Sequence, residues 1–580
     1  MKLTVSNREI SIPLEGTINI ERTSPYTNDD SGSYSFPFPV PRIPNQQNLN
    51  WPGMLQRVGD VEVQSFILEE DGIQLLRGEI DYDEISRDEI GMILKSGHTA
   101  FRSVYDGRKL SSVYFGVEWW PYLVSVDEYG NKTFQDGSWE DKLTIWDEAN
   151  TTDNGIYVAS PFYIGDSLVN KQNWNGPGNS YLAFDGNQYY FLVIDETTPE
   201  QKWHYEMRYV IHGLFCLQFK VSFLIRKPFI NLGYEIVADD FIDSKYGGAI
   251  IFGKVIVIEY DRDTGREVNP HHYLVYSDLM PDMELLTFMD LTAKFFCLVY
   301  EIDELKKEVK IKFKKDIFLA ENISQLKVNE LEGWNHQEIP AAKGFVLEYG
   351  SQTEPRDTEY EYTISLAVDS VLPAASKEGD VIRQNRTGRD FITVLNDQDI
   401  LEWKQIGRLK HYKEGEGETV VTLDTIKIPP QMNFIVNGAN LECPVFGNIL
   451  NTYKPGPVWQ GGFFIDIPLA ISVYRGRILM SGMVYYPVTT FDFILLDGIV
   501  NYGWYSLTPT QLYLNCYSEY LNWKAYRARP FTKYIELTMA QVLTLQWGKR
   551  YVINGVLVIL DTINYELPYW GVVEVKGFTG

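Results

Sequence analysis

Apolar and polar residues alternate along most of this chain, and turn dipeptides interrupt the alternation at short intervals. The stretch VEVQSFILEEDGIQLLRGEIDY shows the pattern most clearly. Asp71-Gly72 separates its two apolar runs, and this pair suits a two-residue hairpin turn in which both residues take a positive φ. Since a period of two places successive side chains on opposite faces, the pattern predicts antiparallel hairpins.

The first part of the chain follows the same pattern. KLTVSNREISIPL and TINIERTSPY alternate and predict strands, with Ile18 and Ile20 on one face. In SFPFPVP the prolines exclude a central position in a sheet, because proline cannot donate a ladder hydrogen bond. Residues 1–110 are therefore predicted to form a small antiparallel β-barrel or sandwich.

One segment, PDMELLTFMDLTAKFFCLVYEIDELKKEVKIKFKKDI, has a helical period in its first half. Pro281-Asp282 predicts the helix start, with Asp282 as the cap and Glu284 in the first turn. The residues predicted to share one buried face are Leu285, Phe288, Met289, Thr292, Phe295 and Phe296.

A hairpin is predicted directly after this helix, because CLVYEI and VKIKFKKDI alternate. Val309, Ile311 and Phe313 would point inward, while the intervening lysines Lys310, Lys312 and Lys314 would face solvent. Gly233 is predicted to end an earlier helix, and TMAQVLTLQW predicts a short helix near the C-terminus.

With 580 residues, the chain is expected to fold into several domains. The predicted class is mainly β with α+β elements: small antiparallel barrels or sandwiches plus a helix-and-hairpin bracing unit. Changes of composition predict a β-barrel at 1–110, an aromatic-rich β insertion at 111–200, an α+β support domain at 201–352, a β domain at 353–480 and an α+β closing module at 481–580.

The charge balance bears on possible partners. Lysine and arginine total 52 against 78 acidic residues, so the formal net charge is −26. Such a surface repels phosphate backbones, so DNA is expected only as passing cargo. The start of the chain lacks the features of a signal peptide, and no long apolar stretch predicts membrane insertion. Four widely spaced cysteines fit a protein made in a reducing cytoplasm.

No recognisable catalytic, cofactor-binding or metal-binding motif occurs in the sequence. GEGETV lacks the third glycine of a dinucleotide-binding loop, and DRDTG lacks the later ligands of a calcium loop. His271 and His272 would point to opposite faces of a strand. The sequence therefore predicts a protein that is not an enzyme and needs no cofactor.

Three tryptophans in the insertion, Trp139, Trp146 and Trp174, lie among Asn, Asp, Gly and Ser. Aromatic rings can stack on the C–H faces of sugars while amides and carboxylates hold the hydroxyls, so these residues are candidate glycan-binding groups. The alternative is that the rings fill the core of a small β module that has few aliphatic residues.

Three segments resemble the tail-hub or baseplate-hub proteins of tailed bacteriophages. INIERTSPYTNDDSGSYSFPF with FILEEDGIQLLRGEIDY is similar to their opening barrel. The stretch from FINLGYEIVADDF through the predicted helix and hairpin resembles their supporting segment. SEYLNWKAYRAR with the last hairpin is similar to the closing module of tail proteins from phages of gut anaerobes.

The resemblance implies a virion protein assembled in the host cytoplasm. It would self-associate as a trimeric ring between tail tube and tip, with tube, tape-measure and tip or spike proteins as partners. One alternative is a tail protein that binds host-surface glycans or a receptor through the tryptophan-rich module. Another is a polysaccharide-degrading enzyme, against which the absence of a signal peptide argues.

Overall fold

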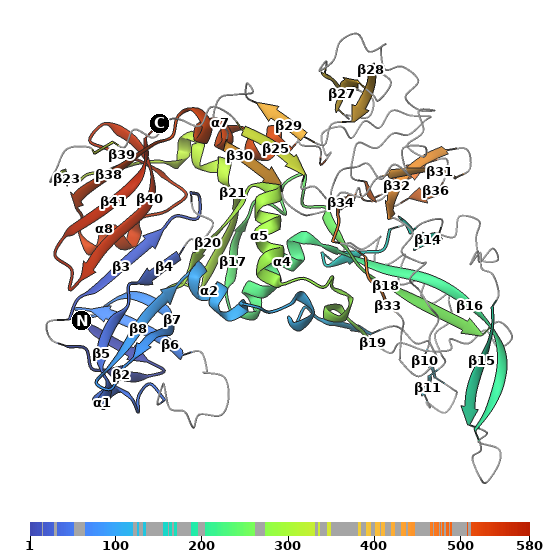
Figure 1. The fold of residues 1–580 in the computed structure, drawn as a ribbon, viewed down its shortest axis with the longest axis horizontal. Helices are drawn as coiled ribbons and strands as arrows, with labels where there is room; N and C mark the ends of the chain where they lie inside the picture. Colours follow the sequence, from blue (N-terminus) through green and yellow to red (C-terminus); the bar gives the residue numbers. More distant parts are fainter. Residues whose placement is uncertain are drawn as a thin grey trace.

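The computed structural model describes residues 1–13, 16–27, 32–50, 64–119, 155–160, 203–261, 273–330 and 512–579, with short segments elsewhere between 124 and 507. The described elements are mainly strands, accompanied by a few helices (Figure 1). The predicted fold class, mainly β with α+β elements, is therefore confirmed.

The N-terminal segment folds into antiparallel hairpins. Asp71 and Gly72 have φ values of 50° and 79°, which confirms the predicted turn between β6 and β7. The elements are β1 (Lys2–Val5), β2 (Arg8–Ile10), β3 (Ile18–Thr23), β4 (Gly32–Ser35), β5 (Phe38–Pro41), α1 (Arg42–Asn45), β6 (Gln64–Glu70), β7 (Ile73–Ile85), β8 (Glu89–Ser96), α2 (His98–Tyr105) and the 3₁₀ turn η1 (Leu110–Ser112).

The C-terminal segment contains the predicted short helix, which begins with a capping box between Thr538 and Gln541. Asn554 and Gly555 form a tight turn further along, as their positive φ values show. The elements are the π-helix η7 (Tyr513–Tyr517), α7 (Ser518–Tyr526), β38 (Arg529–Glu536), α8 (Met539–Thr544), β39 (Arg550–Ile553), β40 (Val556–Leu567) and β41 (Val572–Thr579).

The two ends of the chain meet in one sheet, which sequence reasoning did not predict. β3 pairs antiparallel with β40, from Ile18 opposite Leu567 to Thr23 opposite Thr562. The resulting sheet has 15 strands, and its main path runs β2-β1-β6-β7-β8-β4-β3-β40-β41-β38-β23. In Figure 1 the blue N-terminal strands and the red C-terminal strands accordingly lie side by side. Three short strands join this sheet at the C-terminal side: β22 (Ile323–Leu326), β23 (Asn329–Glu330) and β24 (Asn335–His336).

An apolar core built from both ends of the chain lies beneath this sheet. It combines N-terminal residues such as Leu3, Phe66 and Leu94 with C-terminal residues such as Ile535 and Ile563, all of which are buried. Because each segment supplies part of the other's core, burial of apolar area couples the two ends energetically.

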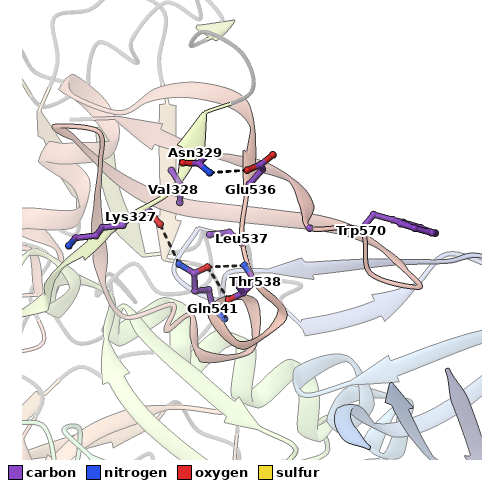
Figure 2. A pocket seen from close by; sticks show the side chains of 9 residues that line it. Lys327, Val328, Asn329, Glu536, Leu537, Thr538, Gln541 and Trp570 are labelled. Atoms are coloured by element: carbon purple, nitrogen blue, oxygen red, sulfur yellow. Dashed lines mark hydrogen bonds between the residues drawn. The ribbon is translucent and has the colours of Figure 1, made fainter. Parts of the chain in front are cut away.

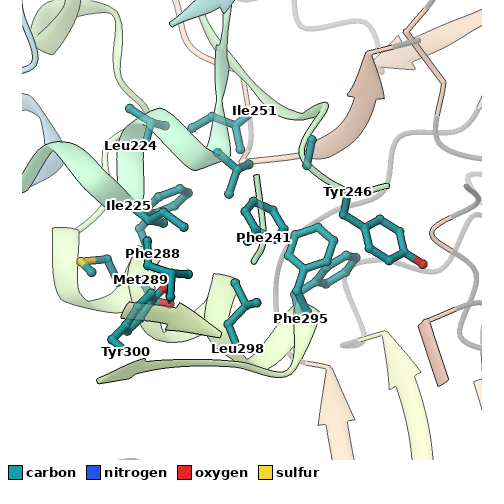
Figure 3. Close-up of a cluster of buried hydrophobic side chains, with 14 of the residues drawn as sticks. Leu224, Ile225, Phe241, Tyr246, Ile251, Phe288, Met289, Phe295, Leu298 and Tyr300 are labelled. Atoms are coloured by element: carbon teal, nitrogen blue, oxygen red, sulfur yellow. Dashed lines mark hydrogen bonds between the residues drawn. The ribbon is translucent and has the colours of Figure 1, made fainter. Parts of the chain in front are cut away.

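The bracing unit of helix and hairpin is also present. It consists of α4 (Val221–Asn231), β17 (Glu235–Asp239), α5 (Leu285–Phe296), β20 (Leu298–Asp303) and β21 (Glu308–Phe313). All six predicted face residues of α5 are buried, and so are Val309, Ile311 and Phe313. Figure 3 shows α5 packing against side chains of α4 and β20. Gly233, with a φ of 78°, follows the end of α4 as predicted.

The predicted start of α5 is wrong by two residues. The helix begins at Leu285, with Glu284 as the cap residue, and Asp282 does not cap it. Residues 282–284 instead run beside the chain at 108–110, where Leu110 donates its amide to the Met283 carbonyl at 2.8 Å. Asp282 forms an ion pair with Lys109 at 2.7 Å. This backbone pairing satisfies groups that a longer helix would have used.

A long β-arm extends from the body (Figure 1). Its central pair is β16 (Trp203–Lys220) and β18 (Ala249–Asp261), which are antiparallel and carry β15 (Asn187–Ile194) on one side. A small core lies at its base and includes Phe162, Phe252 and Phe446.

The remaining strands of the described chain are mostly short. They are β9 (Val117–Trp119), β10 (Val124–Val126), β11 (Lys132–Phe134), β12 (Tyr157–Val158), β13 (Phe162–Ile164), β14 (Ser167–Val169), β19 (Tyr273–Val275), β25 (Phe345–Tyr349), β26 (Val381–Arg383), β27 (Asp390–Leu395), β28 (Leu401–Gln405), β29 (Arg408–His411), β30 (Thr419–Leu423), β31 (Gln431–Val436), β32 (Ala439–Phe446), β33 (Phe464–Ile465), β34 (Ile471–Tyr474), β35 (Ile478–Met480), β36 (Met483–Tyr485) and β37 (Val488–Thr489).

Candidate functional site

The three tryptophans that the sequence singled out for glycan binding, Trp139, Trp146 and Trp174, lie outside the described residues. So do His271 and His272. Within the described ranges, no group of three or more His, Cys, Asp or Glu side chains could hold a metal ion. No helix in the same ranges has the length and apolar character needed to cross a bilayer.

A row of polar side chains crosses the solvent-facing side of the large sheet. Tyr34, Glu21, Asn564, Glu574 and Tyr534 stand opposite one another on β4, β3, β40, β41 and β38 in turn. The Tyr34 hydroxyl donates to Glu21. Glu574 accepts from Asn564 Nδ2 at 2.7 Å and from the Tyr534 hydroxyl at 3.2 Å. The row therefore consists largely of oriented, hydrogen-bonded groups.

These contacts determine the charge state of the row. Burial alone would raise the pKa of Glu574, but the hydrogen bond from Asn564, the Lys576 ammonium and the bond from Tyr534 together lower it below its usual value. Burial, together with the hydrogen bond to Glu21, raises the pKa of Tyr34 to about 12. At neutral pH Glu574 is thus an anion and Tyr34 a neutral donor.

A second row of side chains lies next to the first, and its members make fewer hydrogen bonds with one another. Asn19 on β3 is opposite Glu566 on β40, and both side chains are exposed. The Phe36 amide donates to the Asn19 carbonyl at 2.9 Å, which places the exposed Phe36 ring at this end of the row. Val572 of β41 is also exposed.

These residues line a shallow depression of about 580 Å³ on the sheet face. Apolar surface comes from Phe36, Tyr534, Trp570 and Val572, while the polar groups come from Asn19, Asn564, Glu566 and Glu574. The size lies within the range of about 300–1,000 Å³ that is typical of ligand pockets.

Trp570 is the most exposed aromatic residue of the depression, with 78% of its surface accessible. It lies in the turn between β40 and β41, where Gly571 takes a φ of 85°. The Leu537 amide donates to the Gly571 carbonyl at 3.0 Å, and the Tyr569 hydroxyl donates to the Leu537 carbonyl at 2.5 Å. The turn is therefore anchored, although the indole ring itself projects into solvent.

A second depression, of about 450 Å³, shares Trp570 with the first and is lined by Gly571 of the same turn (Figure 2). Its polar groups bond mainly to one another. Asn329 Nδ2 donates to Glu536 at 3.0 Å, and Gln541 Nε2 donates to the Lys327 carbonyl at 3.3 Å. Since these groups satisfy each other, this depression offers a ligand less than the first one does.

A buried carboxylate cluster joins the N-terminal sheet to the bracing unit. The Tyr234 hydroxyl donates to Glu304, which also pairs with Lys307. Glu79 of β7 lies near this cluster, and burial followed by the negative charge of Glu304 raises its pKa to about 7. This arrangement makes the contact between the two units sensitive to pH.

Sequence reasoning missed the depression beside Trp570. Its aromatic residues are far apart in the chain, and only the pairing of β3 with β40 brings Phe36 close to Tyr534 and Trp570. Two local signals were present. Tyr534 and Val572 are apolar residues at positions where alternation calls for polar ones, and PYWG is a turn that carries two aromatic residues.

Comparisons with known proteins give little further information. No protein-family model and no curated protein matches the sequence. Among solved structures, the 43 kDa tail protein of prophage MuSo2 from Shewanella oneidensis is similar with a TM-score of 0.31 and 7% identity, over 100% of this chain and 97% of that chain. A likeness at this level carries no argument about function.

Proposed function

We propose that the chain is a structural component of a bacteriophage tail tip or baseplate, where it forms an oligomeric hub ring that joins the tail tube to the tip. The observation that supports this is the union of the two chain ends in one sheet with one core. Both ends carry the sequence resemblance to tail hubs.

The third segment that resembles tail hubs, the helix and hairpin, contacts the large sheet and its neighbouring segments directly. The Tyr26 hydroxyl bonds to Glu301 of β20 at 2.7 Å, and the Arg22 side chain donates to the Val542 carbonyl at 2.6 Å. These contacts tie N-terminal, central and C-terminal segments into one body. Such a body is suited to bear load, because separating any two segments exposes core residues and breaks hydrogen bonds.

We also propose that the ring lets DNA pass, and the net charge of −26 supports this part of the proposal. Carboxylates on the wall of a central opening repel the DNA backbone, so the duplex moves through without binding. A permanent ring also requires large contacts, and we expect each pair of subunits to bury more than about 2,000 Å².

The test is a measurement of native mass together with negative-stain imaging of the full chain, alone and mixed with tail-tube and tip proteins. The expected result is a three-fold ring with a central hole. A chain that stays monomeric even with those partners, or a ring whose lumen is basic, contradicts the proposal.

A further inference from the structure

We propose that the depression beside Trp570 is a binding site for a neutral carbohydrate. The proposal does not depend on ring formation. It also differs from the glycan-binding hypothesis for Trp139, Trp146 and Trp174, because it concerns a different part of the chain.

The first argument is the gathering of apolar surface. Single exposed hydrophobic residues are normal on proteins, but several on one hollowed face mark a binding surface. Phe36, Tyr534 and Trp570 are all exposed around one depression, although they come from three separate segments. The backbone of the Trp570 turn is held by hydrogen bonds, so a ligand that stacks on the indole meets a largely pre-organised surface.

The second argument is the presence of available polar groups between the rings. Asn19 and Glu566 face each other on β3 and β40, and within the described part of the chain neither side chain makes a hydrogen bond. An amide both donates and accepts, a carboxylate accepts, and a sugar hydroxyl does both. A ligand with several hydroxyls can therefore pair with both side chains while its C–H face covers an aromatic ring.

The third argument is charge. Glu566 and Glu574 line the depression, and no Lys, Arg or His of the described residues does. The nearest cation, Lys576, is already paired with Glu574 at 3.4 Å. Phosphates, sulfated sugars and sialylated or uronic-acid glycans would therefore be repelled by the lining carboxylates. A ligand without negative charge is favoured.

The position of the site on the sheet argues against an extended peptide. Peptides that add to a sheet bind at an exposed edge, where backbone groups are free. Here β3, β40, β41 and β38 are already paired with one another, so the ligand meets only side chains. A compact polyol with hydroxyls on its rim and C–H groups on its faces fits such a surface.

The experiment uses the full chain on an array of neutral and acidic glycans, followed by calorimetric titration with the strongest neutral glycan. Trp570→Ala removes the stacking surface, Trp570→Phe keeps part of it, and Glu566→Gln removes one charge. Tyr114→Ala is the matched control, because Tyr114 is an aromatic residue on a different surface and is 63% exposed. Thermal unfolding of each variant checks that it is folded.

We expect the wild type and Tyr114→Ala to bind a neutral glycan equally. Trp570→Ala should bind it about 10-fold or more weakly, as for loss of a central aromatic anchor, and Trp570→Phe should fall in between. The proposal is overturned if the wild type binds no neutral glycan, if acidic glycans bind as well, or if Trp570→Ala binds normally.

One further outcome would reassign the surface. If the array shows no binding and Trp570→Ala lowers the native mass of the assembly, the depression is a contact between subunits. That result overturns the carbohydrate site and leaves the hub proposal standing. Glycan binding by a chain that never forms a ring would instead support the carbohydrate site and contradict the hub proposal.

Discussion

The Tyr26 hydroxyl donates a 2.7 Å hydrogen bond to the Glu301 carboxylate, although the two residues are 275 positions apart. Tyr26 is buried beside the N-terminal sheet, and Glu301 lies on β20 of the bracing unit. Burial and the charge of Glu301 raise the pKa of the Tyr26 phenol, so it remains a donor at all ordinary pH values.

Tyr26→Phe should lower stability by about 1.5–3 kcal/mol, because the substitution removes a hydrogen bond to a charged acceptor. Thermal unfolding and urea titration would measure the change. Tyr534→Phe is the matched control, since it removes a bond to Glu574 at an exposed site, and it should stay within about 0.5 kcal/mol of wild type. Equal effects from the two substitutions would contradict the prediction.

Gly548 lies against the same pair. A Cβ at this position would come within 2.5 Å of Glu301 Oε1 and 2.9 Å of the Tyr26 hydroxyl oxygen. Gly548→Ala should therefore destabilise the protein by displacing that hydrogen bond, at a cost of about 1–3 kcal/mol. The check is a double-mutant cycle with Tyr26→Phe. If the two losses simply add, the added methyl group does not act through this bond.

The raised pKa of Glu79 predicts that the stability of the protein depends on pH. Its pKa is raised from 4.5 to about 7 in the folded protein. As the pH rises through that interval, the unfolded chain releases the proton while the folded chain retains it, so stability falls and then levels off above the upper value.

Glu79→Gln should accordingly be more stable than wild type at pH 8, by about 1 kcal/mol after allowance for solvent screening, with the difference vanishing near pH 4. Unfolding midpoints at several pH values would show this. Glu89→Gln on β8 alters an exposed carboxylate and serves as control. Parallel pH profiles for wild type and Glu79→Gln would refute the assignment.

Phe229 tests the packing of the bracing unit. Its ring stacks on Phe101 of α2 with 4.3 Å between centroids, and it is fully buried. Phe229→Ala should cost about 3–5 kcal/mol through lost burial and the cavity left behind. Ile230→Ala changes the next residue, which is exposed, and should cost less than about 0.5 kcal/mol in the same unfolding assay.

Local features of this fold could be predicted from sequence, because they depend on neighbouring residues. The Asp71-Gly72 turn and the buried face of α5 are of this kind. The start of α5 could not be predicted, since the pairing of Glu284 with Lys109 replaces the expected first turn. The parallel pairing of β17 with β21 could not be predicted either, because β18, β19, α5 and β20 lie between the two strands in the chain.

The candidate site could not be predicted from the sequence. Its residues come together only through the pairing of β3 with β40, and no local pattern specifies which distant strand a given strand selects. The tryptophan cluster that the sequence did highlight lies outside the described residues, so its glycan-binding role stays a prediction.

The pairing of β3 with β40 has a consequence for synthesis. Arg22 of β3 meets Val542 across 520 positions, so the ribosome completes nearly the whole chain before the sheet can close. At about 5–20 residues per second, the open edge of β3 waits roughly 30–100 s for its partner. Nascent chains on one messenger carry the same open edge during that interval. Premature termination would leave it open for good, so truncated products should be selectively captured by chaperones or aggregate.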